Sequence, residues 1–411
     1  MQTQPHILIL GLNYPPEKTG VSPYTGALAQ GLQARDFLVR VFTTYQHYPS
    51  WRFSEVDRKW SRTELVSGVQ VVRLRHFLSK KPRGLGRLLS EVSFGVRLLV
   101  AKWGKPDIVL LVSPALISTT LALARIRLMR RPVPAVVWVQ DLYSLGISET
   151  GAGGSLVARI MTWVESRTLR SASHVVVIHP RFKKYVVGTL GVTPERVSIV
   201  RNWSHLPATT AIDVPAVRAR YGWDEDELVV LHAGNMGAKQ GLSNVVEAAR
   251  LADEQEAPIR FVLLGDGSER RILEQTAASI CRIQFIEPIE QNDFQAILVA
   301  ANVLLVNEKP GVSEMAVPSK LTSYFTAGRP VLAATDRFGV TSEEIKSAGA
   351  GIVVDAGDPA QLLAAALSLR DTRRASTFGN NALRFRTEVL GEDAAIKNYA
   401  GLLTNLSRGS D

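Results

Sequence analysis

The sequence predicts an α/β protein with two Rossmann-like, doubly wound domains that face a cleft. Short runs rich in Val, Ile and Leu alternate along the chain with longer segments of helical spacing. Most of these runs lack an alternation of apolar and polar residues, which is typical of parallel strands buried on both faces. The pattern stops once, over residues 203–226, and then restarts. Since 411 residues correspond to two or three domains of about 100–200 residues each, we expect two such domains.

The first domain is predicted over residues 1–205. Its predicted strands are 6–12, 37–44, 69–75, 107–112, 135–141, 174–180 and 197–203. Helical spacing lies between most of them, at 22–35, 85–103, 114–130 and 153–171. This order of elements favours parallel strands joined by crossover helices.

The second domain is predicted over residues 206–385. The segment 203–226, with two prolines and a charge run, is the predicted linker. The strands that follow are 228–234, 259–267, 283–289, 301–307, 330–336 and 351–357. Two helices, around 359–386 and 392–407, end the chain, and we expect the segment 386–411 to pack back on the first domain.

The charge of the chain is concentrated in one segment. The net charge is +10, and between Lys80 and Arg131 there are 11 basic residues against two acidic ones, which leaves +9 in that segment. Such a cluster indicates an anionic partner. The segment 83–103 has one apolar face with basic residues elsewhere, so we expect it to bind an anionic membrane surface. The alternative is a helix that covers the sheet and exposes a solvated basic face.

The remaining composition excludes several classes of protein. The single cysteine, Cys281, excludes an intrachain disulfide and is compatible with a reducing cytoplasm. The start of the chain lacks a basic segment, and no run of about 18–20 apolar residues is present. We therefore expect no signal peptide and no membrane-spanning helix. The location predicted is the cytoplasm, with peripheral attachment at the inner face of the plasma membrane. No nucleic-acid-binding motif accompanies the basic segment, so we expect no nucleic-acid partner.

Two loops are candidates for an anionic ligand because ligands of open α/β sheets bind beyond the carboxyl ends of the strands. The loop 11–32 turns through Gly20 into a helix whose N-terminus suits a phosphate or a sugar hydroxyl. In the loop 232–249, N–H groups from Asn235 to Gly237 can approach a diphosphate, and Lys239 supplies positive charge. An ordinary strand-to-helix turn, and a helix N-terminus with a solvated lysine, are the respective alternatives.

Two further loops complete the candidate site. Gly265 and Asp266 begin a helix after a strand, although this sequence also makes a plain turn. Pro318 suits the first turn of a helix, and Ser319 and Lys320 beside it are placed to bind a phosphate.

These loops together resemble a known family. The matching segments are NYPPEKTGVSPYTGALAQGL (13–32), VQDLY (139–143), HAGNMGAKQGL (232–242) and GVSEMAVPSKLTSYFTAGRPVLAATD (311–336). They resemble the retaining GT-B glycosyltransferases of family four, and most closely the branch that builds colanic acid, O-antigen and capsule repeats with fucose or N-acetylfucosamine-type sugars. The likeness spans nearly the whole chain, and four motifs in the correct structural context are more specific than any one of them.

The resemblance implies a reaction and its partners. The donor is a nucleotide-diphosphate-sugar, and the expected acceptor is a glycan linked to polyprenyl pyrophosphate. The loop around Gly20 closes over the donor diphosphate. Such enzymes generally need no bound metal or other cofactor, and no Asp-x-Asp motif is placed to hold Mg²⁺. Retention is usually described as same-face attack with the leaving phosphate as base, so no dedicated nucleophile is expected.

The resemblance also assigns residues, with departures from the family pattern. Asn235 and Gln240 occupy positions where many members carry an Arg and a Lys that bind the diphosphate, so Lys239 and Lys320 become the candidate cations. The second carboxylate of the family's Glu-x(7)-Glu motif, which holds the ribose, corresponds to Ser323. The first corresponds to Met315, with Glu314 one residue away.

The residues expected to take part in catalysis are Lys320, Glu314 and Asp141. Lys320 would stabilise the leaving diphosphate. Glu314 lies near the transferred sugar, or serves only as a charge complement to a helix N-terminus. Asp141 would orient the acceptor hydroxyl, or it caps the turn that follows it.

Other functions stay open from the sequence. A dehydrogenase should show a G-x-G-x-x-G motif after a strand, which neither half contains. A sugar-nucleotide epimerase needs acid and base residues that we cannot identify. A protein that binds a nucleotide-sugar or an anionic membrane without catalysis is the main alternative, since Ser323 replaces a carboxylate.

Overall fold

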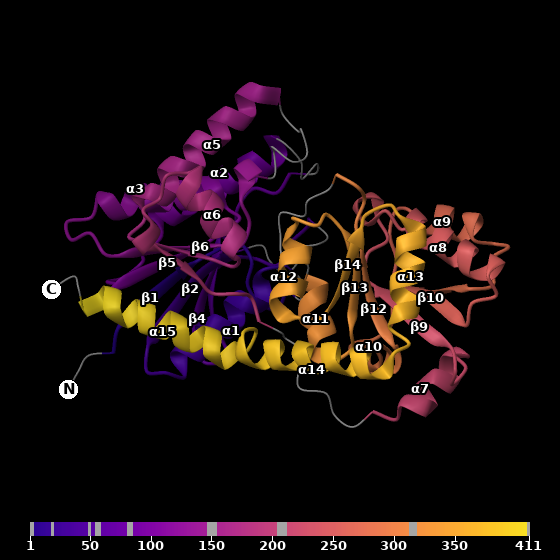
Figure 1. Ribbon diagram of the computed structural model, residues 1–411. Coiled ribbons are helices and arrows are strands. Elements are labelled where there is room, and N and C mark those ends of the chain that lie inside the picture. The colour runs from indigo at the N-terminus through magenta and orange to yellow at the C-terminus, as the bar shows by residue number, and fades with distance from the viewer. Residues whose placement is uncertain are drawn as a thin grey trace. The chain divides into compact units, whose positions relative to one another are not determined.

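The structure, a computed structural model, describes residues 4–17, 20–47, 51–53, 59–79, 85–145, 154–203, 212–311 and 319–408. The chain forms two compact units (Figure 1). The first comprises Met1–Asn202 together with Glu392–Asp411, and the second comprises Trp203–Gly391. The predicted fold class of two Rossmann-like α/β domains is confirmed, since each unit has a mainly parallel sheet flanked by helices.

The first unit contains an eight-stranded sheet in the order β3-β4-β2-β1-β5-β6-β7-β8. Its strands are β1 (His6–Leu10), β2 (Leu38–Thr44), β3 (Ser61–Val66), β4 (Val69–Leu74), β5 (Ile108–Val112), β6 (Ala135–Val139), β7 (His174–Val177) and β8 (Val197–Ile199). All neighbours pair in parallel except β3 and β4. The strand order reverses at β1, so the loops after β1 and β5 lie at the switch point where such sheets bind ligands.

Helices cover both faces of this sheet (Figure 1). They are α1 (Ser22–Gln33), α2 (Leu85–Val100), α3 (Leu116–Arg127), α5 (Gly154–Ser171), α6 (Pro180–Gly188) and α15 (Glu392–Arg408). The last helix belongs to the first unit although it ends the chain. Tyr399 on α15 packs on Trp138 of β6, with ring centroids 5.2 Å apart.

The second unit contains a six-stranded sheet in the order β11-β10-β9-β12-β13-β14, in which every pair is parallel. Its strands are β9 (Leu228–Ala233), β10 (Ile259–Leu264), β11 (Ile283–Ile286), β12 (Val303–Asn307), β13 (Val331–Thr335) and β14 (Gly351–Asp355). Its helices are α7 (Val214–Tyr221), α8 (Ser243–Glu254), α9 (Arg270–Thr276), α10 (Gln291–Ala300), α11 (Ser319–Ala327), α12 (Val340–Ala348), α13 (Pro359–Ser368) and α14 (Thr372–Glu388). Two apolar clusters, one on each side of the sheet, form the core.

Two segments differ from the prediction for local reasons. The predicted linker contains α7, which Asp213 caps by accepting a hydrogen bond from Ala216 N at 3.1 Å, and which Gly222 ends in the left-handed region. The single helix predicted around 359–386 is two helices, because Asp371 caps a new one by accepting from Arg373 N at 3.0 Å. Residues 386–388 therefore belong to α14 of the second unit, and α15 begins at Glu392.

Candidate functional site

Two glycine-containing loops meet at the carboxyl ends of β9 and β10. Gly234 and Gly265 have φ values of +136° and +130°, which favour glycine. A Cβ atom on Gly265 would lie 2.1 Å from the carbonyl oxygen of Gly234. The N–H of Met236 donates to the carbonyl of Asp266 at 2.8 Å, so the two loops are joined backbone to backbone. This close approach requires glycine at position 265, which the sequence singles out.

The turn that follows β9 is closed by the side chain of Gln240. Its Oε1 accepts hydrogen bonds from Asn235 Nδ2 and from the N–H of Gly237, both at 3.2 Å. The helix begins only at Ser243, after a short 3₁₀ turn over Ala238–Gln240. The N–H groups of Met236 and Gly237 thus already have partners within the loops, and Asn235 and Gln240 bind each other.

Lys320 brings a cation to these loops. It lies in the first turn of α11, and its Nζ is 3.2 Å from Nε2 of His232 on β9. A Cβ placed on Gly234 would be 3.0 Å from Cε and 3.6 Å from Nζ of Lys320. The lysine stem therefore passes close to Gly234, and a side chain at this position would push the lysine aside. The structure brings Lys320 together with Asn235, Gly237 and Gln240 at one end of the sheet.

His232 is fully buried and accepts from this lysine. Burial, and then the positive charge of Lys320, hold the pKa of His232 well below its ordinary value. A neutral imidazole can accept a hydrogen bond at Nε2 when its proton is on Nδ1. The ammonium of Lys320 therefore donates to Nε2, and the ring adds no charge of its own.

The buried carboxylate of Glu308 lies close enough to Lys320 to interact with its charge. Glu308 follows β12 and accepts hydrogen bonds from the hydroxyls of Thr335 and Thr341, the latter at 2.5 Å. Burial raises the pKa of Glu308, whereas these hydroxyls and Lys320 lower it. Glu308 and His232 were not predicted as site residues from the sequence, although each stands at the end of a predicted strand next to a candidate loop.

The other predicted donor-side residues lie nearby or fall outside the described chain. Lys239 and Asp266 are exposed, and Asp266 accepts from the N–H of Gly267 at 2.7 Å. Ser323 is half-buried on α11, one turn beyond Lys320 and on the same side of the helix. Ser319 begins α11. Glu314 and Pro318 lie outside the described residues.

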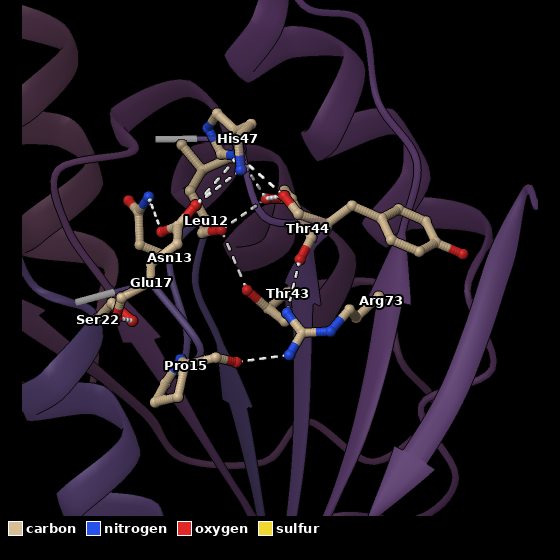
Figure 2. Close-up of polar contacts among 10 residues, drawn as sticks. Leu12, Asn13, Pro15, Glu17, Ser22, Thr43, Thr44, His47 and Arg73 are labelled. Atoms are coloured by element: carbon tan, nitrogen blue, oxygen red, sulfur yellow. Dashed lines mark hydrogen bonds and ion pairs between the residues drawn. The ribbon is translucent and has the colours of Figure 1, made fainter. Parts of the chain in front are cut away.

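The loop after β1 in the first unit is fixed by buried polar groups (Figure 2). Glu17 is 3% exposed, and its carboxylate accepts from the N–H of His47 at 3.0 Å and from Asn13 Nδ2 at 2.7 Å. Arg73 at the end of β4 donates to the carbonyls of Pro15 at 2.5 Å and Thr44 at 3.2 Å. The carboxyl ends of β1, β2 and β4 are thereby joined, and sequence reasoning missed this cluster.

Gly20 stands just beyond this fixed part of the loop. It is exposed, has a φ of +66°, and no atom lies within 4 Å of the place where its Cβ would be. Positive φ, rather than a lack of space, accounts for a glycine at this position.

Asp141 follows β6 in a turn with buried carboxylates around it. Its Oδ1 accepts from the N–H of Leu142 at 2.9 Å, as the turn-capping alternative predicts. Glu165 accepts from the N–H groups of Tyr143 and Ser144 at 2.8 and 3.0 Å. Burial raises the pKa of Glu165. These hydrogen bonds fix the backbone that follows Asp141 at the carboxyl end of β6.

The described residues contain neither a candidate metal site nor a candidate membrane-spanning helix. Within the described ranges, no group of three or more His, Cys, Asp or Glu side chains is arranged to hold a metal ion. In that same part of the chain, no helix is both long and apolar enough to cross a bilayer.

Comparisons with known proteins match both units. Residues 19–203 match the model of a glycosyl transferase 4-like domain, and residues 227–371 match that of glycosyl transferases group 1. The putative colanic acid biosynthesis glycosyl transferase WcaI of Escherichia coli is 32% identical over 340 residues, which cover 78% of this chain and 81% of that protein.

Solved structures share the fold across almost the whole chain. Sucrose-phosphate synthase from Thermosynechococcus elongatus has a TM-score of 0.74 at 18% identity, and the match covers 99% of this chain and 100% of that one. Anabaena Alr3699/HepE in complex with UDP-glucose has a TM-score of 0.67 at 15% identity, with 97% and 99% covered.

Proposed function

The chain belongs to the family of glycosyltransferases that combine a glycosyl transferase 4-like domain with a group 1 domain, and on that premise we propose the following reaction. It transfers a sugar from a nucleotide-diphosphate-sugar to a glycan carried on polyprenyl pyrophosphate, with retention of the anomeric configuration. The reaction is one step in the assembly of an extracellular polysaccharide or lipopolysaccharide.

The observation that carries this proposal is the position of Lys320. Its ammonium lies 3.2 Å from His232 and against Gly234, at the loops where the resemblance implies a diphosphate. The two positions that carry cations in many relatives are the neutral Asn235 and Gln240 here. Lys320 therefore supplies positive charge that these positions do not, with the exposed Lys239 as a second cation.

The chemistry follows from where charge develops. When the bond between the anomeric carbon and the β-phosphate breaks, negative charge grows on the departing diphosphate. A cation fixed in advance at that place stabilises the transition state without having to reorganise. Asp141, which follows β6, would orient the acceptor hydroxyl, and the leaving phosphate would take its proton.

The relatives support the two substrates. HepE is known in complex with UDP-glucose, which supports a nucleoside-diphosphate-sugar as donor for this fold. WcaI is assigned to colanic acid biosynthesis, which supports a growing polysaccharide as acceptor. We extend both to this chain.

A thermal-shift panel of UDP, GDP, ADP, dTDP, CMP, NAD and NADP tests the donor side. A ligand that binds the native state raises the melting temperature. We expect a shift with one nucleoside diphosphate and a much smaller shift with the matching nucleoside. Lys320→Ala should weaken diphosphate binding about 10–100-fold, since a hydrogen bond to a charged group contributes about 1.5–3 kcal/mol.

Lys397→Ala is the matched control, because Lys397 is exposed on α15 of the other unit. A shift with NAD or NADP alone would overturn the proposal in favour of a dehydrogenase. Equal affinity of Lys320→Ala and the native protein for the nucleoside diphosphate would show that Lys320 does not bind the diphosphate.

One observation favours a second candidate, a protein that binds the nucleotide without turnover. Ser323 stands where relatives hold the ribose with a carboxylate, and it lies on the same side of α11 as Lys320. Release of nucleoside diphosphate from the donor that matches the thermal shift separates the two. Binding without release, with membrane extracts as the source of acceptor, would support this second candidate.

A further inference from the structure

Two helices of the first unit, α2 and α5, carry apolar side chains on their outward surfaces, and Leu128, directly after α3, is exposed as well. A surface helix ordinarily exposes polar residues and buries its apolar ones. On α2, Leu89 is 54% and Val100 69% exposed, and on α5, Leu156 is 68% and Trp163 69% exposed. The further exposed apolar residues of this region are Leu88, Val96, Leu99, Leu128, Val157 and Ile160. Apolar residues that are exposed singly are common on protein surfaces, but so many in one region are typical of an interaction surface.

These residues belong to one continuous layer, which we call the α2–α3–α5 face. Gly95 of α2 approaches α3 so closely that a Cβ there would lie 3.0 Å from the Cα of Ser118. Thr120 of α3 and Thr168 of α5 share a hydrogen bond of 2.7 Å. Figure 1 shows α2, α3 and α5 together along the same side of the sheet.

The charge on this face has one sign. Glu91 and Glu165 are the only acidic residues in the three helices, and both are buried, with 4% and 3% exposure. The exposed charged residues are all arginines: Arg87, Arg127, Arg159, Arg167 and Arg170. Arg87 pairs with the buried Glu91 at 3.5 Å, whereas Arg127, Arg159, Arg167 and Arg170 have no acidic partner among the described residues. A surface that combines exposed apolar residues with this positive charge fits an anionic lipid bilayer.

The outward stripe of α5 is divided along its length. Leu156, Ile160 and Trp163 occupy its first half at a spacing of four and three residues, and Arg167 and Arg170 continue the same stripe. Figure 1 shows the first half of α5 extending away from the sheet of the first unit. A hollow of about 710 Å³ lies beside these residues and is lined by Leu156, Arg159, Ile160, Trp163, Ser166 and Thr189. The helix thus has an apolar end, a tryptophan near its middle and a basic second half.

We propose that the α2–α3–α5 face binds an anionic lipid bilayer. The apolar end of α5 enters the acyl region, Trp163 lies at the interface, and Arg167 and Arg170 contact headgroup phosphates. A second copy of this chain is a poorer occupant, because it would bring the same arginines together. The prediction made for segment 83–103 is thereby extended to a surface in which α5 is the inserting element. The inference concerns lipid binding alone and does not depend on the transfer reaction.

Flotation of the full chain with vesicles tests this proposal. We expect binding to vesicles of phosphatidylethanolamine and phosphatidylglycerol, and weak binding to phosphatidylcholine alone. Ile160→Ser/Trp163→Ser should lower the partition coefficient at least about tenfold, because two large apolar side chains are no longer buried in the acyl region. Arg167→Glu/Arg170→Glu should also lower it about tenfold or more, because two favourable contacts with anionic headgroups become repulsive.

Matched controls carry the same changes elsewhere. Ile272→Ser/Phe338→Ser alters residues that are 60% and 86% exposed in the second unit, and Arg271→Glu/Arg373→Glu alters exposed charges there. These controls should bind vesicles like the native chain. All four variants should keep the native melting temperature and nucleotide binding, which separates this test from that of the proposed function.

Three results would overturn the proposal. One is no binding to anionic vesicles by the native chain. Another is equal loss of binding in the controls. The third is a native dimer that Ile160→Ser/Trp163→Ser converts to a monomer with no change in vesicle binding, which would assign the surface to a second copy of the chain.

Discussion

Among the described residues, Lys320 donates to the neutral imidazole of His232. A carboxylate in the place of His232 would cancel the positive charge that a diphosphate needs. Full burial keeps His232 neutral, so the ring can hold the ammonium in place without adding a charge of its own. We infer that His232 is a positioning residue that acts through Lys320.

Replacement of His232 by leucine should lower the affinity for the nucleoside diphosphate about tenfold and leave that for the nucleoside unchanged. Leucine is similar in size but accepts no hydrogen bond, so the lysine loses one of its contacts. Titration calorimetry measures both affinities. His232→Gln keeps an acceptor and should recover part of the loss.

A double-mutant cycle distinguishes positioning from a general structural effect. If His232 acts through the lysine, His232→Leu should have little further effect on affinity in a Lys320→Ala background. Additive losses would contradict the assignment.

A second buried histidine should make the stability of the first unit depend on pH. His76 is 7% exposed, and burial, followed by the charge of His47, lowers its pKa to about 3. Neither ring nitrogen has a hydrogen-bond partner among the described residues. In the unfolded chain a histidine titrates near about 6.5. The unfolded state therefore binds more protons between these two values.

The free energy of unfolding should consequently fall as the pH drops below about 6.5, by up to about 1.4 kcal/mol per pH unit from this group. Above that pH, His76 makes its full contribution to the free energy of unfolding. His76→Phe removes the titration and should flatten the profile relative to the native chain. Urea unfolding of both proteins at several pH values checks this. Parallel profiles would show that the pKa of His76 is the same in the folded and unfolded chain, which would contradict the prediction.

At the scale of elements, the loops after β9 and β10 can coexist only because glycines stand where they cross. A Cβ on Gly265 would lie 2.1 Å from Gly234 O, and one on Gly267 would lie 2.4 Å from Met236 O. Carbonyl groups of the backbone cannot move aside as the end of a flexible side chain can. The crossing brings the loop that carries Asn235 next to the one that carries Asp266.

Gly265→Ala should therefore destabilise the second unit by at least about 2 kcal/mol, through strain at positive φ and overpacking. It should also weaken nucleotide binding, because the loops after β9 and β10 would have to move apart. Thermal unfolding and the nucleotide panel measure the two effects. Gly401→Ala, in α15 with no atom within 4 Å of the added Cβ, is the control and should stabilise by about 0.5–1 kcal/mol. A Gly265→Ala protein with native stability would contradict the crossing.

Most strands could be predicted because a parallel strand buried on both faces consists of consecutive apolar residues. The run 228–234 predicts β9, which is buried at every position. Strand β3 was missed because it is an antiparallel edge strand, mostly polar and exposed, paired to β4 through a tight turn with positive φ at Ser67 and Gly68. Polar edge strands lack the apolar signal on which the other predictions depend.

The site could be predicted only in part. Glycine spacing located the loops and the first turn of α11, since these are local features of sequence. The contact between Lys320 and His232 joins residues 88 apart, and the cluster of Glu17 with His47 joins residues 30 apart. Such pairs depend on strand order, which the periodicity of one sequence does not determine.

At the scale of the whole molecule, the first unit is completed by the end of the chain. The chain leaves that unit after Asn202 and returns to it at Glu392. Ile396 of α15 packs so tightly against α1 that a Cβ on Gly31 would lie 2.4 Å from its Cδ1. The core around Trp138 therefore lacks the packing of α15 until the second unit has been synthesised. Domains generally fold in order during synthesis, and here the first unit depends on the last helix.

Tyr399 gives the clearest test of this dependence, because its ring and its hydroxyl have opposite effects. The ring is fully buried against Trp138, so Tyr399→Ala should lower the free energy of unfolding of the first unit by about 3–5 kcal/mol. The hydroxyl is buried without a hydrogen-bond partner in the described part of the chain, and burial raises its pKa well above the ordinary value. Tyr399→Phe removes this uncompensated group and should leave the stability unchanged or raise it by about 1 kcal/mol.

Hydrogen exchange during urea unfolding separates the two units in this measurement. Tyr399→Ala should raise exchange in β5 and β6 and leave β9 and β12 unchanged, because its effect is confined to the unit that α15 completes. Lys397→Ala, exposed on the same helix, should change neither by more than about 0.5 kcal/mol. A loss of protection in both units with Tyr399→Ala would mean that the two units unfold together. A cost for Tyr399→Phe close to that of alanine would mean that the hydroxyl is hydrogen-bonded, and that α15 depends on a polar contact rather than on packing.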